Sequence, residues 1–256
     1  MISITILGTG NVAQNLFEAF LAKDTVSIVQ VVGRKTDSLN YFKGRASLAT
    51  YGDGLLPAAI YIMAVSDDAI TQVAKNLKVK GLVVHTSGAV SLSALQSHHR
   101  SGVFYPLQTF TIGKLLDFSN IPICIEASDE EDLELLHRLG ASLSNTVARI
   151  DSDKRKVLHL SAVFVNNFTN YMYNIGQELC EQHELDFTLL QPLIRETAEK
   201  IELLDAIGAQ TGPARRGDKK TLHAHLALLK TKKHREIYTL LSNGIRTTYA
   251  FRKDKF

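Results

Sequence analysis

Short apolar runs alternate with amphipathic stretches over the first 150 residues of the chain. Runs rich in β-branched residues predict buried strands. These runs are Ile2–Leu7, Val26–Val32, Ala59–Val65, Gly81–Val84, Gly102–Tyr105, Ile121–Ile125 and Asn145–Ile150. Helical periodicity is found over Val12–Leu21, Asp67–Lys78, Ser91–Ser97 and Asp129–Leu139, and the segment Asp37–Pro57 follows neither pattern. Strands that alternate with helices predict a parallel, doubly wound sheet.

From Asp151 onwards only helical periodicity is visible. The predicted helices cover Ser152–His183, Asp186–Gly208, Asp218–Leu229 and Lys233–Phe251, and a Gly- and Pro-containing loop separates the middle two. A loop of that length inside a helical bundle is often functional. We therefore expect an α/β fold with two domains. An N-terminal Rossmann domain, a doubly wound parallel sheet, covers residues 1–150, and an all-α substrate and dimerisation domain covers residues 151–256.

The first strand runs directly into a glycine-rich turn, Gly8-Thr9-Gly10-Asn11-Val12-Ala13. The spacing is G-x-G-x-x-G/A, between a strand and a helix, which is typical of dinucleotide sites. The first glycine permits the turn, the second lets a pyrophosphate approach the backbone, and the helix N-terminus attracts its charge. We expect Gly8, Thr9, Gly10, Asn11 and Val12 to contact the cofactor. The alternative is a βα turn without a ligand.

The end of the second strand indicates which nucleotide binds. An NAD site places an acidic residue about 20 residues beyond the glycines, to hold the ribose 2′-hydroxyl. Here the strand ends in Gly33-Arg34-Lys35-Thr36 instead. Arg34 and Lys35 can hold a 2′-phosphate through charge-assisted hydrogen bonds, so the sequence predicts NADP. The alternative is a solvated basic turn.

Polar residues also follow the later strands, and ligands of open α/β sheets bind at these carboxyl ends. Val65 and Ser66 would lie along the cofactor, although Ser66 could simply cap a helix. In His85-Thr86-Ser87-Gly88, the histidine could donate a proton and the two hydroxyls could bind an oxygen. A structural histidine is the alternative.

The segment Tyr105–Phe110 suits the wall of a pocket. Gln108 and Thr109 could orient a substrate through neutral hydrogen bonds. The alternative is a turn that Pro106 stiffens.

The helical half carries further candidates. His159 and Asn166 are spaced i, i+7 on one helix face, and Asn167 adjoins them in an apolar stretch. Asparagine is unfavourable inside a helix, so a cofactor or substrate contact would explain the pair, as would a polar contact between helices. Arg215 and Arg216 follow a glycine and a proline and could clamp an anionic substrate group. An exposed basic loop or an ion pair at a subunit boundary is equally consistent.

The composition removes several classes of function. The chain of 256 residues has 45% hydrophobic and 21% charged residues and a net charge of +3, which gives no reason to expect nucleic acid or a membrane as a partner. Cys124 and Cys180 have no disulfide or metal spacing, so we expect no metal site and a reducing, cytoplasmic location. We expect no signal peptide, because the first residues already form a strand, and no apolar run approaches the roughly 20 residues that span a bilayer.

Six segments together resemble a known family: GTGNVA at 8–13, AVSDDAI at 64–70, HTSGAVSLSAL at 85–95, YPLQTF at 105–110, VNNF at 165–168 and TGPARRGD at 211–218. The family consists of Rossmann-like proteins, labelled NADP oxidoreductases, with an all-helical C-terminal domain of unassigned function. Its wider superfamily includes 6-phosphogluconate and β-hydroxyacid dehydrogenases and pyrroline-5-carboxylate reductase. The resemblance implies an NADP-linked reductase fold, commonly dimeric through the helical domain.

The sequence departs from that pattern at two places. The β-hydroxyacid dehydrogenases place a lysine one turn before an asparagine, where this chain has Ala162 and Val163. The family often has a histidine where Tyr105 stands, so Tyr105 would have to replace it as a proton donor.

These observations predict an NADP(H)-dependent reductase or dehydrogenase that acts on a small anionic carbonyl or imine compound. His159 or His85 would be the general acid, with Tyr105 as third candidate. Asn166 and Asn167 would position the substrate, and Arg215 would bind its anionic group. The alternatives are an NADP-binding sensor without turnover, and an interaction protein that dimerises through its helical half and has a vestigial nucleotide site.

Overall fold

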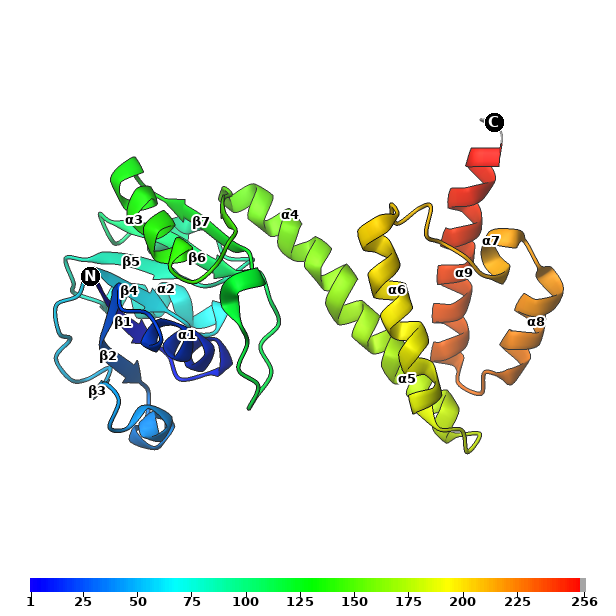
Figure 1. Ribbon diagram of the computed structural model, residues 1–256, viewed down its shortest axis with the longest axis horizontal. Helices are drawn as coiled ribbons and strands as arrows, with labels where there is room; N and C mark the ends of the chain where they lie inside the picture. Colours follow the sequence, from blue (N-terminus) through cyan, green and yellow to red (C-terminus); the bar gives the residue numbers. More distant parts are fainter. Residues whose placement is uncertain (254–256) are drawn as a thin grey trace. The chain divides into compact units, whose positions relative to one another are not determined.

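The computed structural model describes residues 1–253 and divides the chain into two compact units (Figure 1). The first unit is Met1–Val165 and the second is Asn166–Phe256. The predicted boundary at 150/151 lies before the helix α4 (Ser152–Ala162), and this helix belongs to the first unit.

The first unit is built on an eight-stranded sheet in the order β3-β2-β1-β4-β5-β6-β7-β8. The strands are β1 Ile2–Leu7, β2 Val26–Gly33, β3 Ser47–Thr50, β4 Ile60–Met63, β5 Leu82–His85, β6 Ser101–Pro106, β7 Ile123–Ala127 and β8 Val147–Arg149. This order, with β1 at the switch point between β2 and β4, confirms the predicted doubly wound α/β fold.

Two features of the sheet differ from the sequence prediction. The segment expected to be irregular contains the edge strand β3 and a 3₁₀ helix, η1 Thr36–Phe42. In addition, β7 runs antiparallel to β6, whereas the other neighbouring strands are parallel. The β6–β7 connection carries only the short η3 (Phe118–Asn120) and no α-helix that would cross the sheet, so the chain re-enters the sheet from the edge that it left.

Helices cover both faces of the sheet and bury its apolar side chains. On one face, α1 (Asn11–Leu21) packs on β1 and β2, and α3 (Glu130–Ala141) packs on β6 and β7, within one cluster that includes Phe17 and Leu136. On the other face, α2 (Asp67–Asn76) and η2 (Leu92–Leu95) pack on Met63 and Val83. The helix α4 lies on that same face, further along the sheet, where Leu158 contacts the cluster of Val103, Tyr105 and Cys124.

The second unit is helical, as predicted. A π-helical turn, Val163–Phe168, leads from α4 into α5 Thr169–Glu181, η5 Phe187–Leu190, α6 Gln191–Leu203, α7 Pro213–Arg216, α8 Lys219–Leu228 and α9 Lys232–Lys253. The single helix expected over Ser152–His183 is therefore interrupted at the π turn, which contains Asn166 and Asn167. The expected loop after α6 contains the short α7.

Candidate functional site

The glycine-rich turn after β1 has the geometry of a phosphate cradle. Gly8 has φ +126°, and a Cβ on it would lie 2.0 Å from the carbonyl oxygen of Ala64. Only glycine fits this position, because the left-handed conformation and the contact with β4 both exclude a side chain. The Gly8 amide also donates to the Val32 carbonyl at 2.8 Å, so the turn lies directly between β2 and β4.

Gly10 opens the helix α1 and faces open space. A Cβ on Gly10 would meet no described atom within 4 Å, and no side chain caps the helix. The first backbone N–H groups of α1 are thus left for a ligand. The Asn11 side chain donates to the Phe110 carbonyl at 3.0 Å and is therefore already engaged. Asn11 and Val12 can contact a ligand through their backbone N–H groups.

Exposed basic and aromatic side chains follow the strands β2 and β3. Arg34 and Lys35 are exposed at the end of β2. Since Gly33 pairs with Thr50 of β3, Arg34 and Tyr51 follow paired positions. Burial raises the pKa of Tyr51, whereas the nearby Arg34 charge lowers it. The sequence analysis missed Tyr51 because its segment showed no strand pattern.

At the end of β4, Val65 is half-buried and Ser66 is exposed. Ser66 occupies the N-cap position of α2, but its hydroxyl makes no capping hydrogen bond to the helix. Of the two interpretations of Ser66, the geometry favours the one that keeps its hydroxyl free for a ligand.

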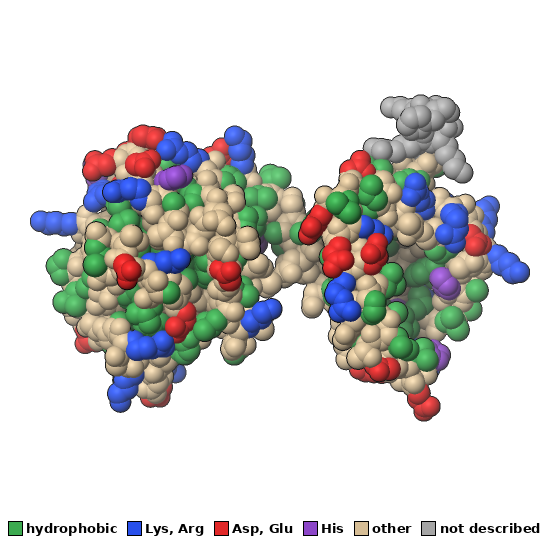
Figure 2. Space-filling view, in the orientation of Figure 1, with side chains coloured by type: hydrophobic (Ala, Val, Ile, Leu, Met, Phe, Trp, Pro, Cys, Tyr) green, Lys and Arg blue, Asp and Glu red, His purple; other side chains and the backbone are tan. Residues whose placement is uncertain are grey.

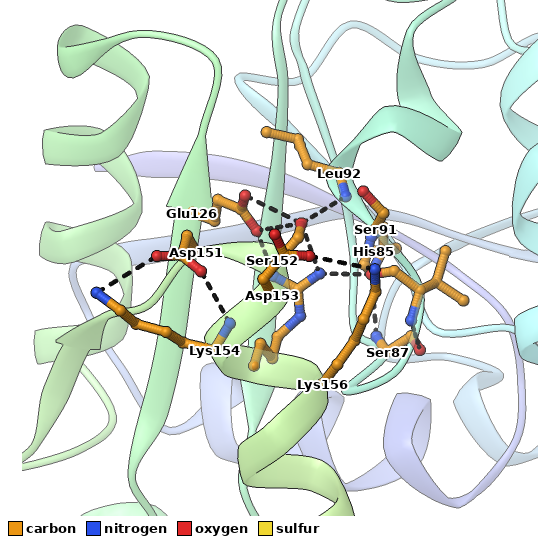
Figure 3. A network of polar contacts seen from close by, with 12 residues as sticks. His85, Ser87, Ser91, Leu92, Glu126, Asp151, Ser152, Asp153, Lys154 and Lys156 are labelled. Atoms are coloured by element: carbon orange, nitrogen blue, oxygen red, sulfur yellow. Dashed lines mark hydrogen bonds and ion pairs between the residues drawn. The ribbon is translucent and has the colours of Figure 1, made fainter.

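His85 is completely buried at the end of β5, beside the polar network in Figure 3. Its Nδ1 accepts from the Ser87 amide at 3.2 Å, and its Nε2 has no hydrogen-bond partner among the described residues. Burial lowers the pKa of His85 to about 4, and the charge of Arg155 adds to this effect, while a contact with the Ser91 backbone opposes it. His85 is therefore neutral near pH 7, which makes it a poor proton donor.

The hydroxyls of Thr86 and Ser87 are used within the turn. Ser87 Oγ accepts from the Ala89 and Val90 amides at 3.1 and 3.0 Å, and Thr86 Oγ1 lies 3.4 Å from the Met63 carbonyl. Their predicted role as cofactor contacts remains a prediction.

Tyr105 and His159 form the most suggestive pair in the first unit. The Tyr105 hydroxyl lies 3.2 Å from His159 Nδ1, although 54 positions separate the two residues. Gly88 lies directly against them, because a Cβ there would approach His159 Nδ1 to 2.6 Å and the Tyr105 ring to 2.7 Å. The sequence analysis gave Gly88 no role, and no local pattern marks this contact.

The electrostatic surroundings keep Tyr105 protonated. Burial is the main cause that raises the pKa of its phenol, Cys124 and Asp67 raise it further, and Arg155 lowers it. Asp67 begins α2, next to Ser66. At neutral pH Tyr105 therefore carries a proton that it can donate.

The remaining predicted residues are exposed. Gln108 and Thr109 are exposed beyond β6, where the Gln108 side-chain oxygen accepts from the Thr109 amide at 2.8 Å. Asn166 and Asn167 are exposed in the second unit. Their roles towards substrate remain predictions.

Arg215 is engaged within its own unit. Its guanidinium donates to the Gln210 carbonyl and lies 5.0 Å from the centre of the Tyr249 ring. Arg215 thus closes the loop before α7, although the side chains of both Arg215 and Arg216 are exposed. Of the two arginines, Arg216 has the freer side chain for an anionic group.

Two classes of site find no support in residues 1–253. No group of three or more His, Cys, Asp or Glu in this range could hold a metal ion. Over the same residues, no helix combines the length and the apolar character that crossing a membrane requires.

Comparison with known proteins gives two family matches. Residues 3–88 match the family described as "NADP oxidoreductase coenzyme F420-dependent", and residues 121–245 match a "domain of unknown function (DUF2520)". No protein of curated function matches the chain.

Solved structures resemble the whole chain. BF3122 from Bacteroides fragilis, assigned as an NADP oxidoreductase, is 38% identical, with a TM-score of 0.89 over 96% of this chain and 98% of that one. A reductive aminase from Aspergillus terreus, in complex with NADPH and ethyl levulinate, is 14% identical (TM-score 0.67; 96% and 94% covered). A 1-pyrroline-5-carboxylate reductase from Streptococcus pyogenes is 13% identical (TM-score 0.62; 96% and 98% covered). The last two show a shared fold.

The predicted cofactor, NADP, agrees with these matches, and the residues fit it. The space at Gly10, the uncapped start of α1 and the exposed cations after β2 suit a diphosphate and a 2′-phosphate.

Proposed function

Because the chain belongs to the NADP oxidoreductase family that includes the Bacteroides fragilis protein, we propose that it reduces or oxidises a small anionic carbonyl or imine compound. Bound NADPH would supply the hydride, and the protein would supply orientation and a proton. The observation that carries the proposal is the Tyr105–His159 pair beside the turn that ends β5.

The roles of the pair follow from its chemistry. Tyr105 donates its proton to the substrate oxygen or nitrogen as negative charge develops there. The phenolate left on Tyr105 then takes a proton from His159, whose Nδ1 lies 3.2 Å from the phenol oxygen, and the other ring nitrogen of His159 takes a replacement proton from solvent. His85 keeps the β5 turn in place through the Ser87 amide and takes no part in proton transfer.

We propose further substrate-binding roles for residues of the second unit. We assign the anionic group of the substrate to Arg216, since Arg215 is held by its own loop. Asn166 and Asn167, in the π-helical turn, supply amide groups for the polar part of the substrate; such turns are frequent at functional sites.

A homodimer is part of this proposal. In the second unit no residue of α6 or α8 is fully buried. The exposed large apolar side chains of the second unit include Leu185, Leu189, Leu193, Ile201, Leu240 and Leu241. Figure 2 shows hydrophobic side chains at the surface of this unit. A second copy of the chain would cover this surface. Both cysteines are free, which supports the expected cytoplasmic location.

The test is NADPH consumption with a panel of imines and carbonyl compounds, each with an anionic and a neutral member. In Tyr105→Phe we expect kcat to fall by about 10²- to 10⁴-fold, the usual contribution of a general acid, with unchanged affinity for NADPH. Tyr41→Phe is the control, because the Tyr41 hydroxyl donates to Glu18 at 2.8 Å, apart from the pair.

Full turnover in both Tyr105→Phe and His159→Gln would exclude the pair as the proton donor. NADPH binding without consumption of any compound would favour the sensor hypothesis.

A further inference from the structure

The helix α4 carries an arginine whose side chain is completely buried. Arg155 has an exposed fraction of 0%, yet it keeps its charge inside the first unit by pairing with the Glu126 carboxylate of β7. Its second terminal nitrogen donates to the Val90 carbonyl and lies 3.3 Å from Ser152 Oγ. A buried charge of this kind is costly unless its partners hold it in a fixed geometry.

Ser152 ties the same three segments together from the first turn of α4. Its hydroxyl lies 2.8 and 3.0 Å from the two Glu126 oxygens and accepts from the Leu92 amide at 2.9 Å. Figure 3 shows Ser152, Glu126 and Leu92 converging where α4 begins. The network therefore joins α4 to β7 and to the segment 87–92, which contains Gly88.

The distance from this network to the Tyr105–His159 pair is similar along the strand β6 and along the helix α4. Glu126 pairs with Val103 across β6 and β7, and Tyr105 lies two residues further along β6, or about 6.6 Å. On α4, His159 lies one turn beyond Arg155, or about 6 Å. Holding Arg155 on Glu126 thus brings His159 over Tyr105.

We propose that Arg155 is a positioning residue that sets the register of α4 on the sheet and so holds His159 against Tyr105 and Gly88. The inference rests on the proposed function only for its catalytic consequence. Its geometric content is independent of turnover, because the Tyr105–His159 contact is part of the fold of the first unit.

The charge of Arg155 reaches the same residues. Burial is the main cause that lowers the pKa of His85 and raises the pKa of Tyr105 and Cys124, and the charge of Arg155 acts to lower all three, which lie on one face of the sheet. Arg155 thus acts on Tyr105 through its charge as well as through the position of α4.

The first test is a double-mutant cycle measured by urea unfolding. Tyr105→Phe and His159→Gln are combined to measure their coupling energy, first in the natural chain and then with Arg155→Met. We expect a coupling above experimental error in the natural chain and none in Arg155→Met. Lys154→Met is the matched control, because Lys154 is the neighbouring residue on α4 and its side chain is 80% exposed.

The second variant, Arg155→Lys, separates charge from geometry. One ammonium group cannot reproduce the planar fork that holds Glu126 and Val90 together. We expect Arg155→Lys to fold, to bind NADPH as tightly as the natural chain, and to lose up to about 100-fold in kcat, the loss that a misplacement near 1 Å can cause. If Arg155→Met does not fold, Arg155→Lys tests the positioning role of Arg155 in its place.

The outcomes separate this inference from the proposed function. Undiminished coupling in Arg155→Met, or undiminished coupling and kcat in Arg155→Lys, would overturn the positioning role. Loss of coupling together with full turnover in Tyr105→Phe would keep the positioning role and reject the catalytic one.

Discussion

His85 and Tyr105 lie on the same face of the sheet, at the ends of neighbouring strands, but their side chains differ in hydrogen-bond partners and in their ability to donate a proton. His85 is fully buried and its Nε2 has no partner within the described residues, so its environment excludes the charged form. Tyr105 has the same buried setting, but its hydroxyl meets His159. A single residue type at a strand end therefore says little about function until its hydrogen-bond partners are known.

The buried His85 should make stability depend on pH. Its pKa is lowered from 6.5 to about 4 in the folded protein, so below pH 6.5 the unfolded chain binds a proton that the folded chain does not. Stability is therefore complete above pH 6.5 and decreases as the pH falls towards 4, by up to about 3 kcal/mol. Urea unfolding at a series of pH values measures this loss.

The matched variants are His85→Gln and His99→Gln. His85→Gln should flatten the decrease between pH 6.5 and 4, whereas His99→Gln should leave it unchanged, because His99 is exposed. An equally steep decrease in His85→Gln would show that other groups cause it.

At the scale of elements, local patterns predicted most strands and helices. β1 and the glycine turn follow from the first 13 residues, because the motif needs only a strand, a turn and a helix start. The reversal of β7 was missed, since strand direction depends on how the chain crosses the sheet and not on the apolar run itself. The edge strand β3 was missed because its residues, Ser47–Thr50, include no run of β-branched apolar side chains.

The helix expected over Ser152–His183 shows the limit of periodicity most clearly. Its continuous helical pattern does not reveal the π turn at Val163–Phe168, which changes the direction of the side chains that follow. The predicted pairing of His159 with Asn166 assumed an unbroken helix.

The candidate site was predicted only in part, because a local sequence pattern does not reveal contacts between distant segments of the chain. Gly8 and Arg34 directly follow strands and Tyr105 lies near the end of one, and an apolar pattern can locate these positions. Arg155 and Glu126, by contrast, are 29 positions apart, and only the register of α4 on β7 joins them.

At the scale of the whole molecule, the two units differ in how many of their apolar side chains are buried. The sheet of the first unit is covered on both faces. Among the described residues of the second unit, the buried apolar side chains are Cys180, Ala209, Ala214 and Leu229, and each keeps an exposed fraction of 5 to 9%. A helical unit with so little buried apolar surface is expected to gain its stability from association.

We therefore expect the chain to be a homodimer with twice the monomer mass of 28.3 kDa. Leu240, exposed by 73% on α9, belongs to the surface that would be covered, so Leu240→Glu should produce monomers. Leu21→Glu is the control, since Leu21 is exposed on the first unit. Light scattering coupled to gel filtration distinguishes the two. A natural chain that remains monomeric at high concentration would contradict the dimer.

The central claim, that the carboxyl edge of the sheet binds NADPH for hydride transfer, is tested most directly by calorimetric titration of NADPH and NADH. We expect NADPH to bind more tightly than NADH. Arg34→Ala should weaken NADPH binding by about tenfold or more, the scale of one or two charge-assisted bonds. Lys43→Ala, an exposed cation beyond η1, should leave it unchanged. Binding of neither nucleotide, or equal binding of both that Arg34→Ala does not alter, would contradict the account.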